Sequence, residues 1–226
     1  MPVPFDYIPA PSTELSLKER AYNQILKWIV NGTLRPKEKL IPPQLAEVLH
    51  IHIDAVREAL QLLEVQEFVI KNQESRFVVT EINKANIKKI LPPLASLQAL
   101  AAELASQHIK QTDIDCLRQI NSNFARALKN RNPLLALIED ENFHGKIIEF
   151  ADNPYIEHSI RTLEAHVRRL FFQKSIYLTH TSIQEHEQII IAFEQKDKVT
   201  SSITMSKNWL RPIEKYYFYE KNKENK

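Results

Sequence analysis

The chain has 226 residues, 43% of them hydrophobic, and a formal net charge of +2. This length allows two domains of ordinary size, and the hydrophobic content can supply each with a core. No apolar run approaches the roughly 18 residues of a membrane-spanning helix, and no charged-then-apolar signal segment opens the chain, so we expect no membrane partner. A single cysteine, Cys116, excludes an internal disulfide, and we therefore expect a cytoplasmic protein.

The first sixteen residues contain four prolines and no hydrophobic periodicity, which predicts a flexible tail. The apolar pattern that follows predicts a helix over residues 17–30, ended by Asn31 and Gly32. A connector then leads to Pro42 and Pro43, which can begin the next helix without losing a needed amide hydrogen bond.

Two short helices around a tight corner are predicted within residues 40–64. In the second helix the apolar residues follow i, i+3, i+4, i+7 spacing and form one inward stripe. This stripe consists of Val56, Ala59, Leu60 and Leu63. The opposite face then carries Asp54, Arg57 and Gln61 outward. This layout is typical of a helix-turn-helix, whose second helix enters the major groove of DNA and uses residues near its N-terminus.

Two β-branched and aromatic runs, residues 68–70 and 77–80, flank a polar stretch and predict a hairpin, the wing of a winged helix-turn-helix over residues 17–82. The candidate DNA-contacting residues of this domain are Gln44, His52, Asp54, Arg57, Lys71 and Arg76. The Asp54 carboxylate could accept a hydrogen bond from cytosine N4, but we favour Asp54 as the N-cap of the second helix.

The charge of this first domain is unusual for a DNA-binding protein. Residues 1–83 carry 9 Lys and Arg against 11 Asp and Glu, whereas the remainder carries 21 against 17. Because neutralisation of phosphates supplies most non-specific affinity, this balance predicts weak and salt-sensitive binding. Binding would then depend on basic residues that could gather on one side: Arg35, Lys37, Lys39, Arg57, Lys71 and Arg76.

From residue 83 onward the sequence shows only helical patterns, which predict an antiparallel helical bundle over residues 83–220. The chain as a whole is therefore expected to be mainly α. The predicted helices span residues 84–109, 113–129, 134–150, 155–173, 182–195 and 198–219. Asp113 and Ser182 are expected to cap their helices, with Ser182 and Glu185 forming a capping box.

Polar residues interrupt the inward faces of two bundle helices. Asp140 and His144 lie at i, i+4 among Leu137, Ile147 and Ile148, and His186 takes a hydrophobic position in the helix over 182–195. Burying these groups without partners would cost several kcal/mol, so each must have one. One candidate partner is a divalent metal, because a carboxylate and two imidazoles suit zinc, nickel, manganese or iron. A hydrogen-bonded Asp-His network is the alternative.

The first domain resembles the DNA-binding domain of the GntR family of bacterial transcription regulators. The similar segments are Asn-Gly-Thr-Leu-Arg-Pro at 31–36, Gln-Leu-Ala-Glu-Val-Leu at 44–49 and Val-Arg-Glu-Ala-Leu at 56–60. The family usually has Ser-Arg-Thr-Pro where this chain has His-Ile-Asp-Ala at 52–55, so Arg57 is the recognition-helix arginine that carries over. Three family glycines are replaced, by Lys37, by His50 and near Ser75.

The second domain resembles the FCD effector domain of the FadR subfamily of these regulators. The similar segments are residues 97–105, Asp-Glu-Asn-Phe-His at 140–144, Asn-Pro at 153–154 and residues 185–197. The resemblance implies metal ligands at Asp140, His144 and His186, with Asn208 where the family has a histidine. It also implies a small carboxylate effector, although the family's arginine near that carboxylate is Leu94 here.

The function that we expect is a ligand-responsive transcriptional regulator that binds double-stranded DNA as a homodimer on a near-palindromic operator. A small-molecule effector, with or without a divalent metal, would bind inside the helical bundle. The alternative is a degenerate regulator whose winged domain no longer reads DNA specifically and serves protein interaction. A metal-dependent hydrolase is disfavoured, because no additional acid-base residue stands at a definite spacing from the metal candidates.

Overall fold

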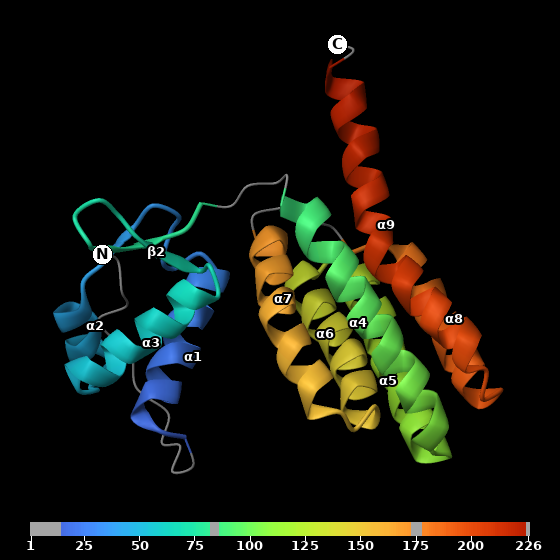
Figure 1. Ribbon diagram of the computed structural model, residues 1–226. Helices are drawn as coiled ribbons and strands as arrows, with labels where there is room; N and C mark the ends of the chain where they lie inside the picture. The colour runs from blue at the N-terminus through green and yellow to red at the C-terminus, as the bar shows by residue number, and fades with distance from the viewer. Residues whose placement is uncertain (1–14, 82–85, 173–177, 225–226) are drawn as a thin grey trace. The chain divides into compact units, whose positions relative to one another are not determined.

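The computed structural model describes residues 15–81, 86–172 and 178–224, with the backbone alone over 212–224. Over this part of the chain it contains nine helices and one three-stranded sheet. The chain divides into two compact units (Figure 1). The first unit comprises Met1–Lys84 with Ala165–Ser175, and the second comprises Ala85–Glu164 with Ile176–Lys226.

The first unit is the predicted winged helix-turn-helix. Its helices are α1 (Leu17–Val30), α2 (Pro42–Leu49) and α3 (Ile53–Val65). Its strands are β1 (Lys39–Leu40), β2 (Val69–Lys71) and β3 (Phe77–Val79), in the antiparallel order β1-β3-β2. The α3 stripe of Val56, Ala59, Leu60 and Leu63 is fully buried, which confirms the predicted inward face of the recognition helix.

The end of the long helix α7 (Pro154–Phe172) belongs to the first unit from Ala165 onward. Arg169 donates hydrogen bonds to the side-chain oxygen and the backbone carbonyl of Thr80, at 3.0 and 2.9 Å. The His166 ring stacks on Phe68 with 4.0 Å between ring centroids, and its Nε2 lies 2.9 Å from the Gln66 carbonyl oxygen. These contacts fix the chain just before β2 and just after β3, at the base of the hairpin.

The second unit is the predicted helical bundle, and the fold class is confirmed as mainly α. Besides the first part of α7, its helices are α4 (Ile87–His108), α5 (Gln111–Lys129), α6 (Pro133–Phe150), α8 (His180–Glu194) and α9 (Lys198–Glu224). Helix α4 packs on α6 and α9, α5 packs on α6 and α8, and α8 packs on α9 (Figure 1). None of the described helices combines the length and apolar character that crossing a membrane requires.

Helix ends differ from the sequence-based expectations at three places. The N-cap of α3 is His52, whose Nδ1 accepts a hydrogen bond from the Asp54 amide, so the prediction of Asp54 as N-cap is wrong. Helix α8 begins at His180 after Thr179, so the prediction of Ser182 as its cap is also wrong. Asp113 lies one turn inside α5, where its carboxylate accepts the amide hydrogen of the cap residue Lys110.

Three residues that replace glycines of the resembling family keep a glycine-like backbone. Lys37, His50 and Ser75 have φ angles of 68°, 53° and 57°. This left-handed region costs a non-glycine residue on the order of 1–2 kcal/mol. The connector, the helix-turn-helix corner and the wing tip therefore keep the local conformations that glycine would favour, although other residues stand there.

Because of this strain, replacing Lys37, His50 and Ser75 together by glycine should stabilise the first unit. We expect the free energy of unfolding to rise by up to about 1 kcal/mol per position, since the greater chain entropy of glycine offsets part of the relief. Urea unfolding of the full chain measures the change.

The matched control is Gly32→Ala at the positive-φ glycine of the chain, where an added Cβ meets nothing within 4 Å. This variant should lose about 1 kcal/mol through the backbone alone. A triple glycine variant less stable than the wild type would contradict the assignment of strain.

Candidate functional site

A groove of about 590 Å³ in the first unit lies between the recognition helix α3 and the wing. Its polar lining residues are Lys39, Arg57, Gln61, Lys71, Ser75 and Arg76. Four basic side chains thus come together from β1, α3, β2 and the wing tip, although the sequence up to residue 83 is net acidic.

Three of these four basic side chains form ion pairs with acidic neighbours. Arg57 lies 3.2 Å from Asp54, Lys71 2.9 Å from Glu64, and Arg76 2.9 Å from Glu74. All three pairs are at least partly exposed to solvent, where an ion pair contributes little to stability. A phosphate group could therefore replace the acidic partner at small cost.

The six predicted DNA-contacting residues divide into two groups. Arg57, Lys71 and Arg76 line the groove, whereas Gln44, His52 and Asp54 are not among its lining residues. His52 and Asp54 lie at the N-terminus of α3, and Gln44 is exposed on α2. The groove adds Lys39, one of the basic residues expected to gather on one side.

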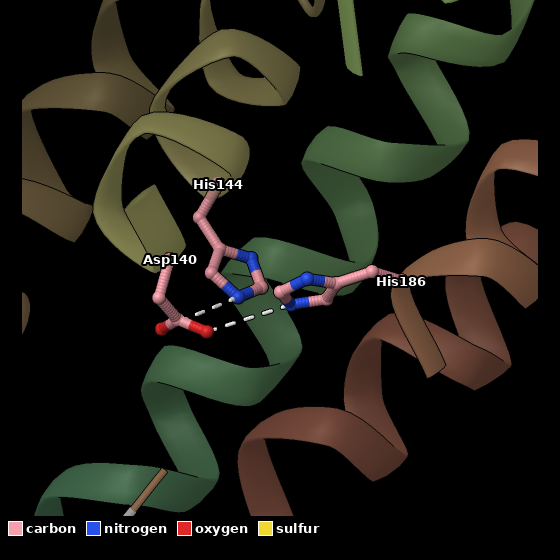
Figure 2. A group of neighbouring side chains, drawn as sticks. All are labelled: Asp140, His144 and His186. Atoms are coloured by element: carbon pink, nitrogen blue, oxygen red, sulfur yellow. Dashed lines mark ion pairs between the residues drawn. The ribbon is translucent and has the colours of Figure 1, made fainter. Parts of the chain in front are cut away.

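The second unit brings the three predicted metal ligands together. Asp140 and His144 project from successive turns of α6, and His186 reaches them from α8 (Figure 2). One possible ligand atom from each of the three lies within 4.8 Å of the others. The Asp140 oxygens lie 3.5 Å from His186 Nε2 and 3.9 Å from His144 Nε2.

Both imidazoles are buried and electrically neutral. Burial lowers the pKa of His144 to about 3, opposed by its contact with the Asn208 amide. The pKa of His186 is well below its usual value, chiefly through burial and then through His144 and Arg211. Burial and, to a smaller extent, the charge of Glu141 raise the pKa of Asp140 to about 7, against the opposing effect of Arg211. Metal ions bind imidazoles in the neutral form and carboxylates in the deprotonated form, so both histidines are in the form that can ligate, whereas Asp140 must lose any proton that it carries.

The buried ring nitrogens of this cluster are not all satisfied. Among the described residues, neither His144 Nδ1 nor His186 Nε2 has a hydrogen-bond partner. A buried polar atom without a partner costs free energy, so such atoms indicate a ligand or a proton that the protein itself does not supply.

Asn208, the fourth predicted ligand, is buried in α9 beside His144. Its amide nitrogen donates to Glu185 Oε2 at 2.8 Å, which leaves the amide oxygen for another partner. Glu185 in turn accepts from Arg211 Nε at 2.8 Å, and Arg211 also donates to Ser182 Oγ at 2.7 Å. The orientation of Asn208 is thus set by an outer ion pair.

Several polar residues around the cluster were not among the predicted site residues. Asn121 contacts His186, Glu185 and Arg211 hold Asn208, and Gln98 Nε2 donates to Glu164 Oε1 at 2.6 Å. Burial, with Glu141 and Asp140, raises the pKa of Glu164 to about 8. Asn121 and Gln98 interrupt buried faces of α5 and α4, the same signal that singled out His186.

Two family models match this sequence. Residues 17–79 match the model described as bacterial regulatory proteins, gntR family, and residues 93–208 match the FCD domain. The second match alone covers half of the chain. Among curated proteins, the HTH-type transcriptional regulator YdhC of Bacillus subtilis is 24% identical over 180 residues, which cover 78% of this chain and 80% of YdhC.

Solved structures share the fold. The E. coli protein McbR/YncC superimposes with a TM-score of 0.74 at 22% identity, covering 91% of this chain and 99% of that one. A GntR transcriptional regulator of Rhodococcus sp. RHA1 superimposes with a TM-score of 0.66 at 14% identity, covering 88% of this chain and 98% of that one. At these low sequence identities, the superpositions establish a shared fold and nothing more specific.

Proposed function

Because this chain belongs to the GntR family of bacterial transcription regulators and carries an FCD effector domain, we propose that it acts as a ligand-responsive homodimer on a near-palindromic operator. Members of this family regulate transcription and are not enzymes. In our proposal the winged unit contacts DNA in the cytoplasm, and the helical unit binds the effector and a second copy of the chain.

The observation that carries the DNA-binding proposal is the groove between α3 and the wing. Arg57 stands on the second turn of the recognition helix, where a helix-turn-helix reaches base edges. Lys39, Lys71 and Arg76 surround it on the sheet and wing, where they can contact phosphates. His52, Asp54 and Gln44 remain candidates for contacts at the edges of this surface.

The alternative of a degenerate winged domain rests on the replaced glycines and on Ile53 at the position of a family arginine. The loss of the glycines has not changed the local backbone, because Lys37, His50 and Ser75 keep positive φ angles. The substitution at Ile53 removes one base contact but leaves Arg57 in the groove. We therefore favour a DNA-binding regulator of reduced affinity over a module that binds only protein.

The helical unit offers apolar surface to a second copy. Val199 and Ile203 lie one turn apart on α9 and are half exposed. Three more exposed hydrophobic side chains lie within the first two turns of α6. The latter are Leu134, Leu135 and Ile138. A homodimer would double the DNA contacts and set the separation of the two half-sites.

The proposed effector site is the polar cluster of α6, α8 and α9. Asp140, His144, His186 and Asn208 fit a divalent metal, since a carboxylate and two neutral imidazoles converge and the Asn208 amide lies beside His144. In addition, His186 Nε2, which faces Asp140, has no hydrogen-bond partner among the described residues. A bound metal would supply positive charge for oxygen atoms of an effector. That charge matters here because Leu94, at the family's arginine position, is fully buried and apolar.

Substitutions at the N-terminus of α3 test the DNA-binding proposal. Arg57→Ala should weaken binding to duplex DNA about tenfold or more and reduce the slope of log affinity against log salt by about one per subunit if Arg57 contacts a phosphate. Asp54→Asn should tighten binding, because it removes a negative charge near phosphates and releases Arg57 from its ion pair. Fluorescence anisotropy over a salt series measures both.

The control is Arg35→Ala, which removes an exposed positive charge outside the groove. Loss of binding with Arg35→Ala but not with Arg57→Ala would show that the groove is not the DNA interface.

Replacement of the fourth ligand tests the metal proposal. Asn208→His should tighten Zn²⁺ and Ni²⁺ binding at least about tenfold, because imidazole is a better ligand than an amide oxygen for these ions, and should change Mn²⁺ binding less. Asn208→Leu should weaken all three. Competition with a chromophoric chelator gives the affinities, and His186→Ala is the negative control. Equal affinities in the wild type and His186→Ala would rule out this site.

A further inference from the structure

Asn121 links helix α5 to two atoms of helix α8. The residue is 5% exposed. Its amide nitrogen donates to the backbone carbonyl oxygen of Ile183 at 3.2 Å, and its amide oxygen lies 3.2 Å from His186 Nδ1. Asn121 therefore connects a fixed backbone group to one side of the imidazole whose other side faces Asp140.

The Ile183 carbonyl determines which way the Asn121 amide points. A carbonyl oxygen can only accept hydrogen bonds, so the nitrogen of the Asn121 amide must face it. The amide oxygen is then turned toward His186 Nδ1, and this oxygen also can only accept. His186 must therefore carry its ring proton on Nδ1.

A neutral imidazole carries one N–H, so a proton on Nδ1 leaves Nε2 with a free lone pair. Within the described residues, Nε2 is the His186 nitrogen that lacks a hydrogen-bond partner, and it lies 3.5 Å from Asp140 Oδ1. Figure 2 shows Nε2 turned toward this carboxyl group. The ring is held in place by Phe143, which stacks on it with 4.0 Å between centroids at 12°, and by Phe124 at 5.3 Å.

We propose that Asn121 is a positioning residue that locks His186 into the Nδ1–H tautomer and so keeps Nε2 as a ready metal-ligating atom beside Asp140. The inference rests on the proposed metal site and adds an outer residue to it. Residues that hydrogen-bond to the remote nitrogen of a ligating histidine fix both its tautomer and its orientation.

The competing arrangement is a hydrogen-bonded Asp-His network without metal. There His186 Nε2–H would donate to Asp140, and Nδ1 would accept from the nitrogen of the Asn121 amide. That exchange would turn the amide oxygen of Asn121 toward the Ile183 carbonyl, placing two acceptors against each other in a buried position. The contact with Ile183 therefore favours the metal-ready tautomer.

The first test uses the metal-free, full-length wild type labelled with ¹⁵N-histidine. Long-range proton–nitrogen spectra, with His186 assigned by comparison with His186→Gln, distinguish a protonated ring nitrogen from an unprotonated one. We expect a protonated Nδ1 and an unprotonated Nε2. The reverse pattern would overturn the proposal.

The second test compares Zn²⁺ affinities of two variants. Asn121→Leu removes the acceptor and should weaken binding by about 10–100-fold, the usual effect of losing such an outer contact. Asn121→Asp keeps an acceptor for Nδ1–H but sets its second oxygen against the Ile183 carbonyl, so it should lower the stability of the fold while still binding Zn²⁺ within a few-fold of the wild type. The control is Asn123→Leu, which deletes a side-chain amide on another face of the same helix. This variant should bind Zn²⁺ like the wild type.

Wild-type affinity in Asn121→Leu would refute the positioning role. If this variant fails to fold, the nitrogen spectra of the wild type and of Asn121→Asp decide, because both should show the same tautomer. A wild type that binds no Zn²⁺ but shows the Nδ1–H tautomer would refute the proposed metal site while supporting the role of Asn121 in setting the tautomer.

Discussion

The burial of one carboxyl group and two imidazoles inside a helical bundle is the constraint on which the arrangement of the second unit depends. Asp140, His144 and His186 occupy positions where hydrophobic residues would stabilise the core at lower cost. Two of their ring nitrogens have no hydrogen-bond partner in the described part of the chain, and such imidazoles persist only if their surroundings hold them in place. The surrounding polar contacts provide that support: Asn121 holds His186, and the Arg211–Glu185 pair holds Asn208. In our proposal, the further partner of this cluster is a divalent cation.

In the winged unit, the net charge and the local charge of the groove have opposite signs. Its acidic balance does not prevent a basic groove, because Arg57 and Lys71 line the groove whereas their acidic partners Asp54 and Glu64 are not among the lining residues. Exposed pairs of this kind exchange easily for phosphate contacts. The net charge therefore predicts modest affinity, whereas in our proposal the position of the cations determines where DNA binds.

Sequence periodicity predicted most of the fold but not the outer contacts of the site. The α3 stripe and the i, i+4 spacing of Asp140 and His144 follow directly from helix geometry. Strand β1 was missed because two residues carry no period, and the helix caps at Asp54 and Ser182 were wrong because helix ends are weakly encoded. The role of Asn121 depends on which atoms it faces across helices, which no single-chain pattern reveals.

We propose that this chain reads DNA as a dimer under the control of its helical unit. The most direct measurement is selection of bound sequences from a random duplex library by the full-length protein, in metal-loaded and chelated form, at low and physiological salt. We expect a short inverted repeat whose half-sites lie about one helical turn apart, with recovery that differs between the two forms. Recovery without sequence preference in both forms would contradict it.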